Sequence, residues 1–200
     1  YLEIIPQSFS IILKKNTSLN QIRFFQGLNT EERIKQINIS VSIKKNEVSA
    51  YKAKKITSAI DLNKICFYSP DRYWEKIIPK DNYFIIERDE FYILRSKEAI
   101  TIKNNQAAEL EPFKDSFGNF RVHYAGFFDP GFGLTELGAS KTKAVLEVRS
   151  HDVPFLIEQD QTVCRLVYEP MANVPSILYG ESGSSNNYQA QGLKLAKHFI

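Results

Sequence analysis

One carboxylate stands in the middle of an apolar run whose pattern predicts a strand. Residues 144–148 read Ala-Val-Leu-Glu-Val, so Glu147 has Leu146 and Val148 as its neighbours. A carboxylate in such a run is costly to bury unless it has a partner or a role. Apolar surroundings raise the pKa of a carboxyl group and a strand holds it rigidly, which suits a general base that takes a proton from water. The alternative is a strand glutamate that points to solvent, which period-two alternation permits.

A sharp turn precedes this strand in the sequence. Residues 123–128 are rich in aromatic side chains and predict a strand, which runs into Asp129, Pro130 and Gly131. Proline presets φ and glycine is free to adopt a positive φ, so these residues predict a rigid turn. The side chain of Asp129 is more typical of one that braces such a turn by accepting backbone amides than of one that performs chemistry.

Basic residues are only slightly in excess. The 200-residue chain has 26 Lys and Arg against 23 Asp and Glu, a net charge of +3, which implies neither nucleic acid nor membrane and suits an anionic small molecule equally well. Arg121 and His123 are two positions apart and therefore share one face of a strand. The pattern alone favours a surface cation pair there, and it favours a solvated face for the lysine cluster at residues 52–55.

The C-terminal stretch combines a polar, flexible segment with amide and basic side chains. Residues 180–187 are rich in Gly, Ser and Asn, and Tyr188, Gln189, Gln191 and Lys194 follow them. Amide donors and positive charge after such a hinge suit closure over an anionic ligand. The alternative is a disordered tail. The apolar residues near its end favour docking on the rest of the molecule.

Several kinds of site are excluded because their motifs are missing. A zinc deaminase requires H-x-E together with P-C-x-x-C. None of the three histidines lies in H-x-E, and Cys66 and Cys164 are far apart in the sequence. The glycine-rich phosphate-binding motifs are absent as well. The two cysteines lie in apolar runs, which indicates buried, reduced thiols in a cytoplasmic protein, and no apolar run has the length of a membrane-spanning helix.

Short apolar runs separated by turns predict an all-β sandwich or barrel. A hairpin is expected over residues 4–26, followed by a short helix over residues 30–37. Tyr73 and Trp74 are expected to cover a core. The other predicted strands lie at residues 37–43, 83–86, 91–95 and 99–102.

A weak internal echo predicts two copies of one domain. Residues 13–24 are echoed by residues 157–168, each after an apolar strand and a polar turn. We therefore expect residues 1–27 to be the closing hairpin of a first copy whose remainder is missing. Residues 28–74 would connect it to the second copy, residues 75–200. The chain does not begin with Met, which fits a fragment of a longer protein.

Three motifs, in order, resemble those of the deoxycytidine triphosphate (dCTP) deaminases of the trimeric dUTPase superfamily. Residues 125–132 are similar to A-G-[FW]-I-D-P-G-[FY], residues 145–147 to [TV]-L-E, and residues 179–192 to the tail Y-G-x-n-K-Y-Q-G-Q. Residues 9–27 and 91–132 are similar to the long bacterial form, which has two repeats. The resemblance therefore covers nearly the whole chain.

The resemblance implies a mainly β fold, a jelly-roll-like dUTPase/dCTP deaminase domain with a few short helices. It also implies hydrolytic, zinc-independent deamination of dCTP to dUTP, in which Glu147 is the catalytic base and Mg²⁺ accompanies the triphosphate. The expected partners are dCTP and dUTP, dTTP as a candidate regulator, and further copies of the chain in a homo-oligomer. The expected substrate-binding residues are Arg121, His123, Ala125, Gly126, Asp129, Tyr188, Gln191 and Lys194.

The chain departs from the family pattern at three places. The family's phosphate-binding segment G-R-S-S-x-x-x-R should fall within residues 111–121, which retain only single Lys, Ser and Arg residues as partial replacements. Asn187 stands in place of the tail lysine, and residues 134–143 are an insertion. We hypothesise a composite site in which a first repeat supplies the missing segment, so that the missing half would be needed for activity.

Two rival interpretations follow from the same residues. A dUTPase would hydrolyse the triphosphate instead of removing the amino group of the base. Asp129 fits this interpretation, but the tail lacks the Gly-rich arm with an aromatic residue that such an enzyme requires. The second rival is a non-catalytic repeat that binds nucleotides or serves oligomerisation.

Overall fold

The structure is a computed structural model that describes residues 3–22, 24, 35–112, 120–123, 127–139, 141–184 and 187–200; for residues 112 and 120–123 it describes the backbone alone. The strands are β1 (Ile11–Ile12), β2 (Lys35–Ser40), β3 (Ala50–Ala53), β4 (Ile60–Asp61), β5 (Trp74–Ile77), β6 (Tyr83–Ile86), β7 (Phe91–Ala99), β8 (Gln106–Pro112), β9 (Phe120–His123), β10 (Phe127–Phe128), β11 (Lys143–Ser150), β12 (Phe155–Glu158) and β13 (Thr162–Pro170). The short 3₁₀ helices η2 (Pro70–Arg72) and η3 (Thr135–Leu137) lie between strands.

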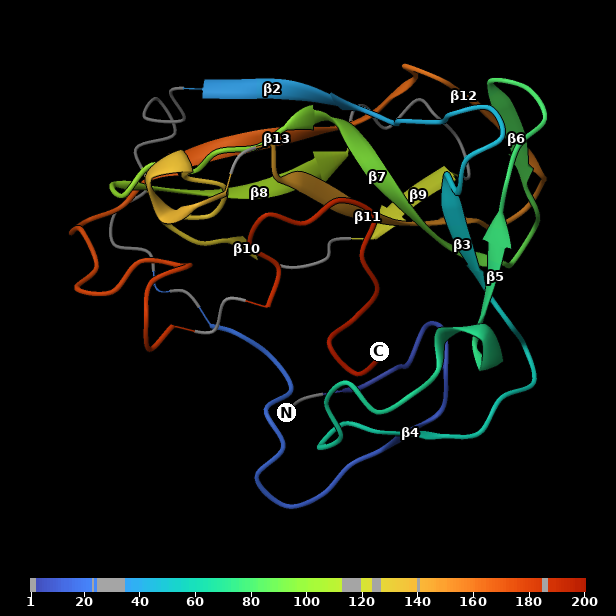
Figure 1. Ribbon diagram of the computed structural model, residues 1–200, viewed down its shortest axis with the longest axis horizontal. Helices are drawn as coiled ribbons and strands as arrows, with labels where there is room; N and C mark the ends of the chain where they lie inside the picture. Colours follow the sequence, from blue (N-terminus) through green and yellow to red (C-terminus); the bar gives the residue numbers. More distant parts are fainter. Residues whose placement is uncertain are drawn as a thin grey trace.

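Two antiparallel sheets dominate the molecule (Figure 1). One has the order β5-β3-β7-β11-β9 and the other the order β10-β8-β13-β2. The prediction of a mainly β fold is confirmed. Strands β2 and β3 come from the segment expected to connect two repeats, and each pairs with a strand of the later part of the chain, β13 and β7 respectively. The division of the chain into repeats stays a prediction.

The main core lies between the two sheets. In β11, Ala144, Leu146 and Val148 are fully buried in this core, while the residues between them are half-buried on the opposite face of the sheet. Period-two alternation thus places Glu147 on the outer face, away from the main core. Burial of β11 side chains fixes its register because a slip by one residue would bring Glu147 into the core.

A second hydrophobic cluster covers the outer face of the β7–β11 sheet. Both faces of β7 are buried, since Tyr92 and Leu94 belong to the main core while Phe91 and Ile93 belong to this second cluster. The cover consists of the N-terminal segment, the loops around β4 and the C-terminal tail, which lie together below the sheets in Figure 1. The buried members of the second cluster are Phe9, Ala53, Ile60, Tyr73, Trp74, Phe91, Ile93, Leu195 and Phe199.

The N-terminal segment differs from the hairpin expected over residues 4–26. In the described part of this segment, the strand residues are Ile11–Ile12, and they pair in parallel with β4. The reason lies in tertiary contacts: the ring of Phe9 is buried in the second cluster, and the Lys14 ammonium lies 2.6 Å from the carboxylate of Asp61. These contacts draw the segment across the outer face, whereas local turn propensity alone favours a hairpin.

Three further predictions can be compared with the structure. Of the helix expected over residues 30–37, residues 30–34 lie outside the described residues and the remainder belongs to β2. Tyr73 and Trp74 are buried, as expected for residues that cover a core. The expectation of two buried thiols is wrong for Cys66, which is exposed, whereas Cys164 is buried in the main core, where desolvation raises the pKa of its thiol to about 12.

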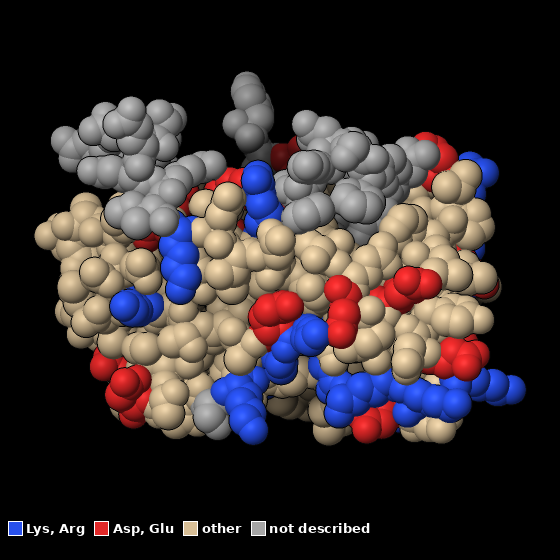
Figure 2. Space-filling view, turned by 90° about the horizontal axis from the view of Figure 1, so that it is seen from above, with Lys and Arg blue, Asp and Glu red and all other residues tan. Residues whose placement is uncertain are grey.

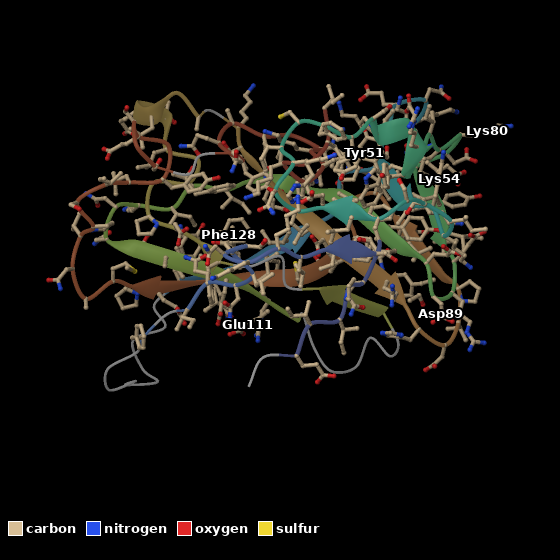
Figure 3. The ribbon with its side chains drawn as sticks, turned by 90° about the horizontal axis from the view of Figure 1, so that it is seen from below. Tyr51, Lys54, Lys80, Asp89, Glu111 and Phe128 are labelled. Carbon is tan, nitrogen blue, oxygen red and sulfur yellow. The ribbon has the colours of Figure 1, made fainter. Side chains whose placement is uncertain are left out.

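Charged side chains of both signs lie near one another on the face seen from above (Figure 2), as the near balance of acidic and basic residues predicts. Lys54 and Lys80 lie at one end of the molecule, well apart from Phe128 (Figure 3). Lys54 and Lys55 are exposed, which agrees with a solvated face for most of the cluster at residues 52–55. In the described part of the chain, no helix is long and apolar enough to cross a membrane.

Replacing Phe9 by Leu is expected to lower the free energy of unfolding by about 1–2 kcal/mol. The ring of Phe9 makes edge-to-face contacts with Tyr73, Trp74 and Phe199 at centroid distances of 5.3, 5.0 and 6.2 Å, and leucine loses them. Phe24→Leu is the matched control, because Phe24 belongs to the same segment and is 94% exposed. Equal urea midpoints for the two variants would contradict the anchoring role of Phe9.

Candidate functional site

Glu147 projects from the outer face of β11 beside a central strand of the sheet. Its backbone pairs with Ile93 of β7 on one side and with His123 of β9 on the other. A residue held between two neighbouring strands has a fixed backbone, so its carboxyl group is well positioned for chemistry. The strand predicted around Glu147 is confirmed.

A cavity of about 510 Å³ opens beside Glu147. This volume lies in the range typical of small-molecule sites. Glu147, Val145 and Ile93 of the sheet form one side of it. The other lining residues are Gln21 from the N-terminal segment, Phe127, Phe128, Asp129 and Phe132 from the strand and turn, and Tyr179, Tyr188, Gln191, Lys194, Leu195 and Ala196 from the tail.

Burial raises the pKa of the Glu147 carboxyl group above its usual range. Desolvation is the physical cause, because burial in apolar surroundings disfavours the charged form. No hydrogen bond joins this carboxylate to another described residue. Among the described residues, the other charged groups that line the cavity are Asp129 and Lys194. A carboxyl group with a raised pKa in a cleft is a candidate for proton transfer.

The turn after β10 is held by main-chain hydrogen bonds. The N–H of Gly131 donates to the carbonyl of Ile102 (3.1 Å), and the N–H of Tyr179 donates to the carbonyl of Pro130 (2.8 Å). Gly131 has φ +99° and Gly133 has φ +72°, the left-handed region that favours glycine. A Cβ on Gly133 would lie 2.0 Å from the carbonyl oxygen of Ile100, so this turn tolerates no side chain there.

The Gln189 side chain joins the C-terminal tail to this turn. Its Oε1 accepts a hydrogen bond from the N–H of Gly133 (2.9 Å), and its Nε2 donates to the carbonyl of Gly131 (3.1 Å). The next tail residues follow the start of β11: the N–H of Lys143 donates to the carbonyl of Gln191 (2.9 Å), and the Nε2 of Gln191 donates back to the carbonyl of Lys143 (3.0 Å). The tail is therefore docked, which decides against the alternative of a disordered tail for its described residues.

The far end of the tail is fixed as well. The N–H groups of Cys66 and Phe67 donate to the carbonyls of Lys197 and His198, both at 2.9 Å, and the ring of Phe199 is buried in the second cluster. Residues 192–196 lie between these two attachments. Lys194 lies there, with its ammonium 5.7 Å from the centroid of the Tyr188 ring and hydrogen-bonded to the carbonyl of Asn187.

Ala190 is the strained residue of this tail, with φ +55°. A left-handed backbone costs a residue with a Cβ about 1 kcal/mol, a cost that glycine avoids. Ala190→Gly is therefore expected to raise the stability of the docked tail by about 0.5 kcal/mol, after the entropy that glycine adds to the unfolded chain. The rate of hydrogen exchange at the backbone amide of Leu193 measures the stability of the docked tail. Ala196→Gly, at an exposed tail position without positive φ, is expected to change exchange in the opposite direction.

The sequence matches a known protein family over most of its length. Residues 13–199 match the model of the 2′-deoxycytidine 5′-triphosphate deaminase (DCD), C-terminal domain. The chain belongs to this family. A crystal structure of 2′-deoxycytidine 5′-triphosphate deaminase from Agrobacterium tumefaciens is 45% identical to it, with a TM-score of 0.63, over 68% of this chain and 42% of that chain. This chain thus spans less than half of the length of that protein. No curated protein matched the sequence.

In this DCD C-terminal domain, the structure brings several expected site residues together. The cavity lining includes Glu147, Asp129, Tyr188, Gln191 and Lys194. Gln191 and Tyr188 also support the tail, since the N–H of Lys197 donates to the Tyr188 hydroxyl (3.3 Å). Their roles toward a substrate stay predictions.

The remaining expected residues are described less fully or not at all. Arg121 and His123 belong to β9, next to Glu147, and only their backbone is described. Ala125 and Gly126 lie outside the described residues, as do residues 113–119 of the segment that replaces the family's phosphate-binding motif.

Three polar residues in or next to this site, Gln189, Tyr179 and Gln21, were not among the substrate-binding residues expected from the sequence. Gln189 stands inside the recognised tail motif, which could have identified it. Tyr179 begins that motif, and its hydroxyl accepts a hydrogen bond from the N–H of Tyr188 (2.9 Å). Gln21 is far from the other site residues in the sequence; it lies in the family-like segment 9–27, but no motif there marks it as a binding residue.

Proposed function

We propose that this chain supplies the catalytic carboxylate for hydrolytic deamination of dCTP to dUTP. The observation that carries the proposal is Glu147, a strand-borne carboxylate whose pKa burial raises, beside a cavity of about 510 Å³ and under a docked tail. Membership in the DCD family supports dCTP as the substrate.

The proposed reaction uses Glu147 as a general base. Its carboxylate takes a proton from a water molecule, whose oxygen adds to C4 of cytosine, and passes that proton to N3. Glu147 then takes the proton of the new C4 hydroxyl and gives it to the amino group, which leaves as ammonia, so that C4 becomes the carbonyl carbon of uracil. Apolar residues beside Glu147, Ile93 and Val145, limit competing hydration of the carboxylate.

Zinc independence is part of the proposal. Cys164 is buried in the main core and Cys66 is exposed in a loop near the tail, so the two thiols are not placed to share a metal. In the described part of the chain, no group of three His, Cys, Asp or Glu residues could hold a metal ion. We assign Mg²⁺ to the triphosphate oxygens of the substrate, because this hard cation prefers oxygen ligands and is commonly bound through substrate phosphates.

A composite, oligomeric site is the other part of the proposal. The chain spans 42% of its solved relative, and the family's phosphate-binding segment is replaced here by residues 111–121. A first repeat or a second copy of the chain would supply the missing serine and arginine groups, and dTTP would compete for the same cavity.

The test compares the products that the full-length protein forms from dCTP and dUTP. Ammonia from dCTP without pyrophosphate is expected, and the rate is expected to survive a zinc chelator such as phenanthroline in the presence of Mg²⁺. Pyrophosphate from dUTP would instead identify a dUTPase. Calorimetric binding of dCTP, dUTP or dTTP without any product would identify a non-catalytic repeat, and loss of activity with phenanthroline would contradict zinc independence.

A further inference from the structure

We propose that Gln21, from the N-terminal segment, is a ligand-binding residue of the cavity. This inference rests on the proposed function and assigns part of its substrate recognition. Gln21 lines the cavity together with Glu147, although 126 positions of sequence separate the two residues. Its Nε2 donates a hydrogen bond to Oδ1 of Asp129 (3.2 Å), in the turn that forms one wall.

The segment that carries Gln21 is attached to the domain at several points. The Arg149 guanidinium donates to the carbonyl of Gln7 (2.5 Å), from the same outer face of β11 that carries Glu147. Further along, the N–H of Ile60 donates to the carbonyl of Ser10 (2.9 Å), and Lys14 lies 2.6 Å from Asp61. Residues 7–14 are thus fixed on the outer face, and this limits where residues 15–22 can reach. Gln21, seven residues beyond Lys14, lies beside the cavity.

The chemistry of the contact fixes the orientation of the Gln21 amide. An ionised carboxylate only accepts hydrogen bonds, so the amide nitrogen of Gln21 must face Asp129. The amide oxygen is left to face elsewhere, and it accepts no hydrogen bond from any described residue. The side chain is exposed, so this oxygen is satisfied by water until a ligand enters.

A nucleotide carries two kinds of donor that suit this oxygen. One is the exocyclic amino group of cytosine, and the other is the 3′-hydroxyl of the sugar. Both donate a hydrogen bond to an amide oxygen, and a site that accepts from a ligand donor discriminates against analogues that lack it. Through this contact, the N-terminal segment contributes to the substrate specificity of a site whose catalytic carboxylate, Glu147, lies in β11.

The proposal is tested by calorimetric titration of the full-length protein and its Gln21→Ala variant with dCTP, dUTP and 2′,3′-dideoxy-CTP. Gln21→Ala is expected to weaken dCTP binding about 10-fold. It should also reduce one of two preferences: dCTP over dideoxy-CTP if the oxygen binds the 3′-hydroxyl, or dCTP over dUTP if it binds the amino group. Asn20→Ala is the matched control, because Asn20 is the exposed neighbour outside the cavity lining, and its affinities should match those of the wild type.

The outcomes separate this inference from the proposed function. Wild-type binding that Gln21→Ala leaves unchanged, or weakens equally for all three nucleotides, would overturn the role of Gln21 and leave the proposed function intact. Failure of the wild type to bind any of the three nucleotides would overturn both. Equal melting temperatures of the two variants and the wild type are expected, and they show that a change in binding is not a change in folding.

Discussion

Replacing Glu147 by Gln is expected to lower the rate of ammonia release from dCTP by about 10²–10⁴-fold in the full-length protein. Glutamine has nearly the same shape as glutamate, so the packing against Ile93 and Val145 is kept. It cannot accept a proton from water at neutral pH, and the first step of the proposed reaction is lost. The measurement is kcat from an ammonia assay.

Glu136→Gln is the matched control for this variant. Glu136 is an exposed residue of η3 outside the cavity lining, so the same chemical change is expected to leave kcat within about twofold of the wild type. Full ammonia release by Glu147→Gln would show that another group is the base.

The raised pKa of Glu147 also predicts how the stability of the protein depends on pH. Because burial raises the pKa in the folded state, folding costs more once pH exceeds the carboxyl pKa of the unfolded chain, about 4.3. Stability falls as pH rises from that value to the raised pKa, and it is level above. Relative to the wild type, Glu147→Gln is therefore expected to be more stable at pH 8 than at pH 4. Urea unfolding at the two pH values measures this difference.

Replacing Gly133 by Ala is expected to destabilise the protein by about 4 kcal/mol or more. Its φ of +72° already disfavours a residue with a Cβ, and the added carbon would lie 2.0 Å from the carbonyl oxygen of Ile100. Backbone would have to move, and with it the hydrogen bond from Gly133 to Gln189 that holds the tail. The measurement is the urea midpoint, with near-ultraviolet circular dichroism to detect loss of packing.

Gly138→Ala separates the two causes. Gly138 has φ +75°, nearly the same backbone conformation, and nothing lies within 4 Å of its added carbon. Only the conformational cost of about 1 kcal/mol applies there. If the two variants had equal stability, the close approach to Ile100 would have no energetic effect.

The sequence predicted those parts of the site that depend on local patterns. The strand around Glu147 follows from its apolar neighbours, and the turn at residues 129–131 follows from its proline and glycine. The outer layer could not be predicted in this way. Its attachments, such as Arg149 to Gln7, join segments far apart in the sequence, and the N-terminal apolar residues were therefore assigned to a local hairpin.

The residues that complete the cavity show the same limit. Gln189 was visible within a motif, although its hydrogen bonds to the turn were not, because they depend on how the tail folds back. Gln21 lies in a segment with apolar residues such as Leu19 and Ile22, and nothing in that pattern marks a single glutamine as a ligand-binding residue. Only the path of the chain over the sheet brings its amide to Asp129.

The double attachment of the tail has a consequence for the thermodynamics of ligand binding. Gln189 holds one end and Phe199 the other, so the segment between them is ordered when the chain folds. A free arm that closed on a ligand would lose its conformational entropy during binding, with a large unfavourable entropy term. In this protein the tail loses that entropy when the chain folds, before any ligand binds. Ligands of different size should therefore bind with similar, small entropic penalties, and the differences in their affinity should arise from contacts within the cavity.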